Sequence, residues 1–192
     1  METKSISKDE INALPIRRYE GPIVLVASPA EVERALADFA QERLVGFDTE
    51  TRPTFKVGQK HPVALVQAAT NRAVYLFQLQ RMDCAPVLRE LLQSKTLKAG
   101  VGIGDDLKAL RELFAFEPDG IADLGAIARR KGYERSGVRA LAAMFLGFRI
   151  PKGTKTSNWA APRLSPAQIA YAATDAWACR ELYLRFESLG II

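Results

Sequence analysis

The sequence LVGFDTE at residues 44–50 begins with a mainly apolar run, Leu44 to Asp48, which predicts a buried strand. Two further strand-like runs follow at residues 63–68 and 73–79, and Gly58 and Pro62 mark the first connection as a loop. Because the connections between these strands are short, we expect the three to pair as an antiparallel meander.

Helix and strand patterns alternate on both sides of this meander. Serine, proline and Glu or Gln at residues 28–31 and 165–168 are typical of helix starts. The expected strands outside the meander are at 23–27 and 97–101, and the expected helices are at 29–41, 85–93, 105–114, 122–131, 138–147 and from 166 toward 189. The pattern predicts an α/β domain with a mixed sheet, antiparallel first and parallel later, flanked by helices.

The length of 192 residues corresponds to one domain. We expect residues 1–22, which include a short helix capped at Ser7, to form an arm outside the core, and residues 23–192 to form the domain. Residues 148–164 are expected to be an ordered loop. No apolar run approaches the roughly 20 residues of a membrane helix, and the N-terminus lacks an apolar signal core. These features predict a soluble, cytoplasmic protein.

Metal and thiol chemistry based on histidine and cysteine is excluded by composition. The chain has one histidine, His61, and two distant cysteines, Cys84 and Cys179, which form no CxxC pair. Neither a zinc site nor a Cys/His nucleophile can be assembled from them. We expect both cysteines to be buried as small apolar side chains.

Positive charge is concentrated in one segment, although the net charge of the chain is only +5. Residues 129–163 contain nine basic residues and one acidic residue, Glu134, a local balance of +8. The basic residues are Arg129, Arg130, Lys131, Arg135, Arg139, Arg149, Lys152, Lys155 and Arg163. Charge alone leaves two interpretations open, a surface for nucleic-acid phosphates and an ordinary solvated surface.

Acidic residues occur at two strand ends. Asp48 and Glu50 are two positions apart and therefore point to the same side of the sheet. The stretch GVGIGDD at residues 100–106 resembles a dinucleotide-binding loop, but Asp105 replaces the third glycine, and acids at a helix N-terminus repel a pyrophosphate. The alternative role of Asp105 and Asp106 is to favour the helix dipole.

The last predicted helix contains a tyrosine and an acid one turn apart. Tyr171 and Asp175 share a helical face, so the phenol and the carboxylate can converge. Ala172, Ala173 and Ala176 are small enough to let this helix approach a sheet closely. Taken alone, such a tyrosine is more often a core residue with its hydroxyl satisfied, and such an aspartate is more often a solvated acid.

Together, FDTE (47–50), GVGIGDDL (100–107) and YAATD (171–175) resemble the three motifs of the DEDD superfamily of 3′–5′ exonucleases, in its tyrosine branch, on the ribonuclease H-like fold. The stretches TRPTFKVG, VALVQAAT, AVYLF and SNWAAPRLSPAQIAYAATDA are similar to the Werner-type exonuclease domain and the catalytic domain of ribonuclease D. The resemblance covers about residues 23–186. Those proteins carry further domains for which 192 residues leave no room, so we expect a stand-alone exonuclease domain.

The resemblance implies metal-dependent hydrolysis of phosphodiester bonds at the 3′ ends of DNA or RNA, with release of nucleoside 5′-monophosphates. It implies two divalent cations, Mg²⁺ or Mn²⁺, held by Asp48, Glu50, Asp106 and Asp175, with Asp48 bridging them, and Tyr171 orienting the attacking water. Asp105 is the rival of Asp106, and a shared helical face with Leu110 and Leu113 favours Asp106. Converging carboxylates need cations, because two like charges 4 Å apart repel by about 4 kcal/mol at an effective dielectric of 20.

The basic loop before the last helix is expected to contact the nucleic acid, which we expect to be single-stranded. Lys152, Trp159 and Arg163 are the residues that the resemblance places near the substrate. For Trp159, stacking on a base and anchoring the loop in the core are both open. The competing hypothesis for the whole chain is a nucleic-acid-binding module that has lost catalysis. Such a module would be expected to lack one of the metal-binding acids or the tyrosine, and this sequence contains all four acids and the tyrosine.

Overall fold

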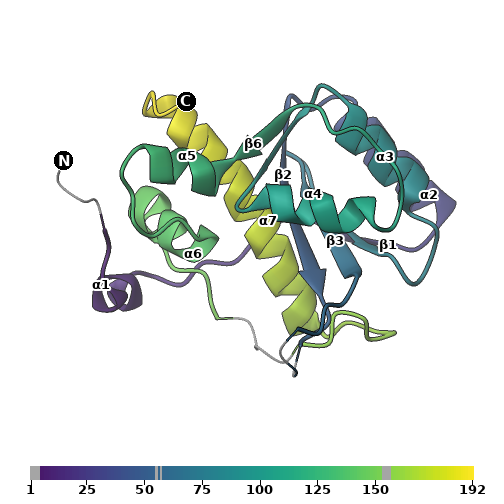
Figure 1. Ribbon diagram of the computed structural model, residues 1–192, viewed down its shortest axis with the longest axis horizontal. Coiled ribbons are helices and arrows are strands. Elements are labelled where there is room, and N and C mark those ends of the chain that lie inside the picture. The colour runs from purple at the N-terminus through teal and green to yellow at the C-terminus, as the bar shows by residue number, and fades with distance from the viewer. Residues whose placement is uncertain (1–4, 55, 57, 153–156) are drawn as a thin grey trace.

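The computed structural model describes residues 5–54, 56, 58–152 and 157–192. Over these residues it contains a six-stranded mixed sheet with the order β1-β4-β3-β2-β5-β6 (Figure 1). The strands are β1 (Ile23–Val26), β2 (Leu44–Thr51), β3 (Val63–Ala69), β4 (Val74–Gln78), β5 (Leu97–Gly100) and β6 (Ile121–Asp123). Strands β2, β3 and β4 pair antiparallel and form the predicted meander, whereas β1, β5 and β6 join in parallel.

Helices cover both faces of this sheet. They are α1 (Lys8–Ala13), α2 (Pro29–Phe39), α3 (Ala85–Gln93), α4 (Ile103–Arg111), α5 (Leu124–Arg130), α6 (Val138–Leu141), continued by a π-helical turn η1 (Ala142–Leu146), and α7 (Pro166–Ser188). Core residues of α2, α3 and α4 pack on one face of the sheet, and those of α7 pack on the other, with α5 and α6 beside α7. In Figure 1, α7 runs diagonally through the centre of the molecule, with α5 and α6 on one side of it and α2 and α3 on the other. The predicted α/β class, mixed sheet and flanking helices are confirmed.

Two predicted element boundaries are wrong. The helix expected at 122–131 is preceded by the short strand β6, because the Asp123 side chain accepts a hydrogen bond from the Ala126 amide and starts the helix only at Leu124. The helix expected at 105–114 runs from Ile103 to Arg111. Asp105 and Asp106 therefore lie inside its first turn.

The alternation of side chains along β2 separates the core from the site. Val45 and Phe47 are buried among the residues of α2, α3 and α4, whereas Leu44 packs with residues of α7 on the opposite face. Because the side-chain period of a strand is two, Asp48 and Glu50 share the face of Leu44. The acids of β2 therefore point toward α7.

Helix α7 lies unusually close to β2 because the contact positions are small. A Cβ atom on Gly46 would collide with the backbone carbonyl oxygen of Ala176. On the helix side, Ala172, Ala173 and Ala176 are fully buried. The prediction that these alanines permit a close approach of helix and sheet is confirmed.

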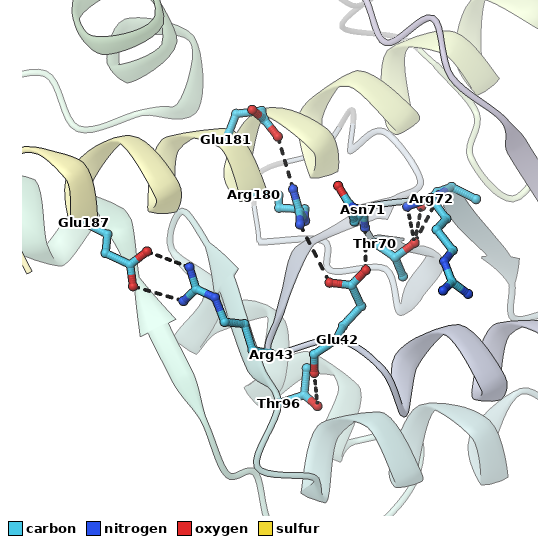
Figure 2. A network of polar contacts seen from close by, with 10 residues as sticks. Glu42, Arg43, Thr70, Asn71, Arg72, Thr96, Arg180, Glu181 and Glu187 are labelled. Atoms are coloured by element: carbon cyan, nitrogen blue, oxygen red, sulfur yellow. Dashed lines mark hydrogen bonds and ion pairs between the residues drawn. The ribbon is translucent and has the colours of Figure 1, made fainter.

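A polar network fixes the C-terminal half of α7 to the segment that leads into β2 (Figure 2). Glu187 forms a double ion pair with Arg43, with distances of 3.0 and 2.6 Å. The guanidinium of Arg180 lies 3.7 Å from Glu42 and 3.4 Å from Glu181, and Glu42 also accepts a hydrogen bond from the Asn71 amide at 2.7 Å. These contacts fix the position of α7 relative to β2, which sets where the acids of the two elements meet.

Three further expectations concern the chain as a whole. Both cysteines, Cys84 and Cys179, are buried and unpaired, as predicted. Lys155 of the basic segment lies outside the described residues. Over the described part of the chain, no helix combines the length and apolar character that crossing a membrane requires.

Candidate active site

Three carboxylates from two distant parts of the sequence meet between β2 and α7. Asp48 and Glu50 point from β2, Asp175 comes from α7, and one oxygen of each lies within 4.8 Å of the others. Asp175 is 3% exposed, whereas Asp48 and Glu50 are partly exposed. Three of the four predicted acids therefore form one cluster, and two of its members are partly exposed to solvent.

Asp106 approaches the cluster from α4. Its carboxylate accepts a hydrogen bond of 2.6 Å from the Thr49 hydroxyl, which lies between Asp48 and Glu50 on β2. The neighbouring Asp105 is exposed, whereas Asp106 is half-buried and its negative charge raises the pKa values of Asp48 and Glu50. Its carboxylate is not one of the three that lie within 4.8 Å of one another. The prediction that Leu110 and Leu113 both point into the core holds for Leu110, which is fully buried. It is wrong for Leu113, which is 43% exposed because α4 ends at Arg111.

Burial and mutual repulsion disfavour the ionised forms of these carboxyls. Burial, followed by the negative charges of Asp175, Asp106 and Glu50, raises the pKa of Asp48 far above its usual range. The pKa of Glu50 rises to about 8 for the same reasons, and burial raises the pKa of Asp106 to about 6. A positive charge placed between these groups would reverse the effect.

The donor set fits a hard divalent cation. One carboxylate oxygen of Asp175, Oδ1, is buried and has no hydrogen-bond partner within the described structure. Buried polar atoms are nearly always satisfied, so this oxygen is available for a ligand. Together with Asp48 and Glu50 it offers only oxygen ligands, which suit Mg²⁺ or Mn²⁺.

Tyr171 lies one helical turn before Asp175 on α7. Its pKa is raised above the ordinary value by burial and by the nearby negative charges, Asp175 first among them. The interaction with the phenol in turn lowers the pKa of Asp175, which burial nevertheless raises to about 6. Tyr171 therefore stays protonated at neutral pH and can donate a hydrogen bond beside the carboxylates.

A hollow of about 490 Å³ lies directly beside the cluster. Its lining includes Glu50 and Tyr171, and also Arg139, Lys152 and Trp159. Acidic and basic side chains thus share one open space, which suits a ligand that carries both metal-binding oxygens and negative charge.

The structure adds Arg139 to the site. The sequence offers it only as one of nine basic residues between 129 and 163, because no motif surrounds it. Its Nε donates a hydrogen bond of 3.2 Å to the Ile150 carbonyl oxygen, which holds the half-buried guanidinium at the hollow. Its positive charge lowers the pKa of Asp175.

The three residues expected to contact nucleic acid lie in different surroundings. Lys152 is exposed and lines the hollow. Trp159 is 6% exposed and packs with core residues and with the Tyr171 ring, at 6.1 Å between ring centroids, so the loop-anchoring interpretation describes its packing. Arg163 lies at a separate hollow of about 370 Å³ beside β3 and β4 and does not line the one at Glu50. Contact of these residues with nucleic acid stays a prediction.

Comparisons with known proteins agree with this geometry. A family model described as 3′–5′ exonuclease matches residues 23–190. The bifunctional 3′–5′ exonuclease/ATP-dependent helicase WRN of Mus musculus is 32% identical over 199 residues, which cover 97% of this chain and 14% of that protein. This chain spans less than a third of the length of the first curated relatives that it matches.

Two solved structures share the fold. The Nibbler EXO domain of Aedes aegypti has a TM-score of 0.77 at 25% identity, with 92% of each chain covered. The Trypanosoma brucei ribonuclease D in complex with RNA U12 has a TM-score of 0.73 at 21% identity, with 86% of this chain and 62% of that chain covered. The residues matched by the family model, 23–190, include all six strands, α7, the four acids and Tyr171. The chain therefore belongs to the DEDD family of 3′–5′ exonucleases.

Proposed function

We propose that this chain hydrolyses single-stranded DNA or RNA from the 3′ end and releases nucleoside 5′-monophosphates. The observation that carries the proposal is the meeting of Asp48, Glu50 and Asp175 within 4.8 Å, beside a hollow that also contains basic side chains. The relative with RNA U12 in its structure supports a nucleic-acid strand as the substrate.

The acids are proposed to hold two divalent cations, Mg²⁺ or Mn²⁺. Asp48, Glu50 and Asp175 would bind one cation, and Asp106 would bind the second together with Asp48. When bound, such cations stabilise the attacking and the leaving oxygen of an in-line displacement at phosphorus. The high pKa values of the carboxyls support this role, because a cation between them offsets both the cost of burying their charges and the repulsion between neighbouring carboxylates.

Tyr171 is proposed to orient the attacking water. Its phenol is protonated at neutral pH, so it acts as a hydrogen-bond donor and not as the base. Arg139 and Lys152, on the same hollow, would bind the non-bridging phosphate oxygens. Water attacks the phosphorus of the 3′-terminal nucleotide and gives up a proton to the solvent, the bond from phosphorus to the upstream 3′-oxygen breaks, and that oxygen takes up a proton from the solvent. The terminal nucleotide leaves with its 5′-phosphate.

The test uses 5′-labelled DNA and RNA 12-mers, both single-stranded and with a recessed 3′ end, incubated with Mg²⁺, Mn²⁺ or EDTA. We expect a ladder that shortens one nucleotide at a time from the 3′ end, release of nucleoside 5′-monophosphates, and no reaction in EDTA or with Asp48→Asn. Binding of the oligomers without shortening, in either metal, would refute the exonuclease and favour a non-catalytic binding module.

A further inference from the structure

Hydrogen bonds attach the N-terminal arm, residues 5–22, to the part of the molecule that contains the candidate site. The backbone of Arg149 exchanges hydrogen bonds with Pro15 and Arg17 (2.9 and 3.2 Å), and its guanidinium donates to the Leu14 carbonyl oxygen at 3.1 Å. The Tyr19 amide donates to the hydroxyl of Thr174, the neighbour of Asp175, at 3.0 Å. The arm is therefore held both by Arg149, before the basic loop, and by Thr174 of α7, next to Asp175.

This attachment places one arginine and one lysine side chain of the arm at hollows next to the site. Arg18, exposed between two fastened residues, lines a hollow of about 360 Å³ together with Tyr171 and Lys152. Lys8, at the start of α1, lines a hollow of about 450 Å³ between α1 and α6, together with Arg135, Arg139 and Lys152. Figure 1 shows α1 beside α6, on the side of α7 away from α2 and α3.

Lys152 connects the hollows into one surface. It lines the hollow at Glu50 and both of the hollows to which the arm contributes. Among the described residues, no acidic side chain lines either arm hollow, whereas Arg18 and Lys152 line one and Lys8, Arg135, Arg139 and Lys152 line the other. Apolar side chains, including Ile11 and Val138, line the same hollow as Lys8, Arg135 and Arg139.

Such a surface matches a single strand of nucleic acid. Cations bind successive phosphates along the backbone, and apolar surface between them accepts bases that are not paired. A single nucleotide bound at the carboxylates would not reach all of these lysine and arginine side chains. Only a strand that continues beyond the site would contact them.

We propose that the N-terminal arm is a nucleic-acid-binding element that uses Lys8 and Arg18 to hold the phosphates of the substrate strand upstream of the scissile bond. The inference deepens the proposed function and rests on it for the position of the scissile bond. Under this proposal the arm binds the substrate strand, and the preferred substrate is an oligonucleotide several nucleotides long.

The experiment measures binding of labelled single-stranded oligothymidylate, a 12-mer, by fluorescence anisotropy in EDTA at a series of salt concentrations. It compares the full chain with Lys8→Gln/Arg18→Gln. Each phosphate contact contributes about 0.7 to the slope of log K against log salt for a single strand. Loss of two contacts should make the slope shallower by about 1.4, so that raising salt from about 50 to about 200 mM weakens the wild-type complex about sevenfold more than that of the variant.

The matched control is Lys95→Gln/Arg185→Gln, which removes the same charge from exposed positions that line none of the three hollows. It should keep the wild-type slope, and Lys8→Arg/Arg18→Lys should restore it. A wild-type slope in Lys8→Gln/Arg18→Gln, or an equal loss in the control, would overturn the proposal. Because binding is measured without metal and without turnover, it tests the arm even if no hydrolysis is found. If hydrolysis is found, the preference in kcat/KM for a 12-mer over a trimer should fall in the arm variant.

Discussion

Replacing Asp175 by asparagine should stabilise the metal-free protein at alkaline pH. Asp175 is 3% exposed, one of its oxygens has no hydrogen-bond partner in the described structure, and burial raises its pKa to about 6. A carboxyl with a raised pKa in the folded state favours folding at low pH, and this contribution is lost as the pH rises through the folded-state value. The asparagine side chain of the variant would have nearly the same shape without the charge.

The magnitude follows from the change in pKa. A rise from 3.8 to about 6 means that the ionised carboxyl lowers the stability by about 3 kcal/mol at pH 8, relative to a neutral side chain. It has almost no effect below about pH 4, where the carboxyl is neutral in both states. For a protein of this size, 1 kcal/mol shifts the melting temperature by about 2–4 °C. Asp175→Asn should therefore melt roughly 6–12 °C above the wild type at pH 8 in EDTA.

The assay is thermal and urea unfolding followed by circular dichroism at pH 4 and pH 8, with EDTA or with Mn²⁺. Mn²⁺ should stabilise the wild type, by about 2.7 kcal/mol at a concentration 100 times its Kd, and should stabilise Asp175→Asn much less. The control is Asp105→Asn on the exposed side of α4, which should change stability by no more than about 0.5 kcal/mol. A variant Asp175→Asn that is no more stable than the wild type at pH 8 in EDTA would refute the reasoning.

Three further substitutions test other parts of the structure. Tyr171→Phe should lower kcat at least about 100-fold while keeping the thermal stabilisation by Mn²⁺, and full turnover would contradict its orienting role. Arg139→Gln removes a charge that lowers the pKa of Asp175, so calorimetry should find that Mn²⁺ binding requires a higher pH; an unchanged pH dependence would count against that contact. Gly46→Ala inserts a Cβ against the backbone of α7 and should cost about 1–3 kcal/mol or more in urea unfolding; an unchanged unfolding midpoint would contradict the close contact of α7 with β2.

Much of the fold could be predicted because it depends on local patterns. The apolar runs of the meander and the serine caps of α2 and α7 each need only a few neighbouring residues, and the structure contains them where they were expected. The strand β6 could not be predicted in this way. Its three residues are strand only because they pair with β5, while locally they resemble the start of α5.

The candidate site, too, combines features that local sequence indicates with features that depend on tertiary contacts. The motifs around Asp48 and Asp175, together with the small residues of α7, already indicated that β2 and α7 meet through their acids. Arg139 shares its hollow with Glu50 and Tyr171, and Tyr19 of the N-terminal arm bonds Thr174 next to Asp175, so both placements depend on residues far apart in the sequence. No local pattern contains such contacts, because the hydrogen bonds that fix Arg139 and Tyr19 join backbone and side chains that only the packing of α6, α7 and the arm brings within reach.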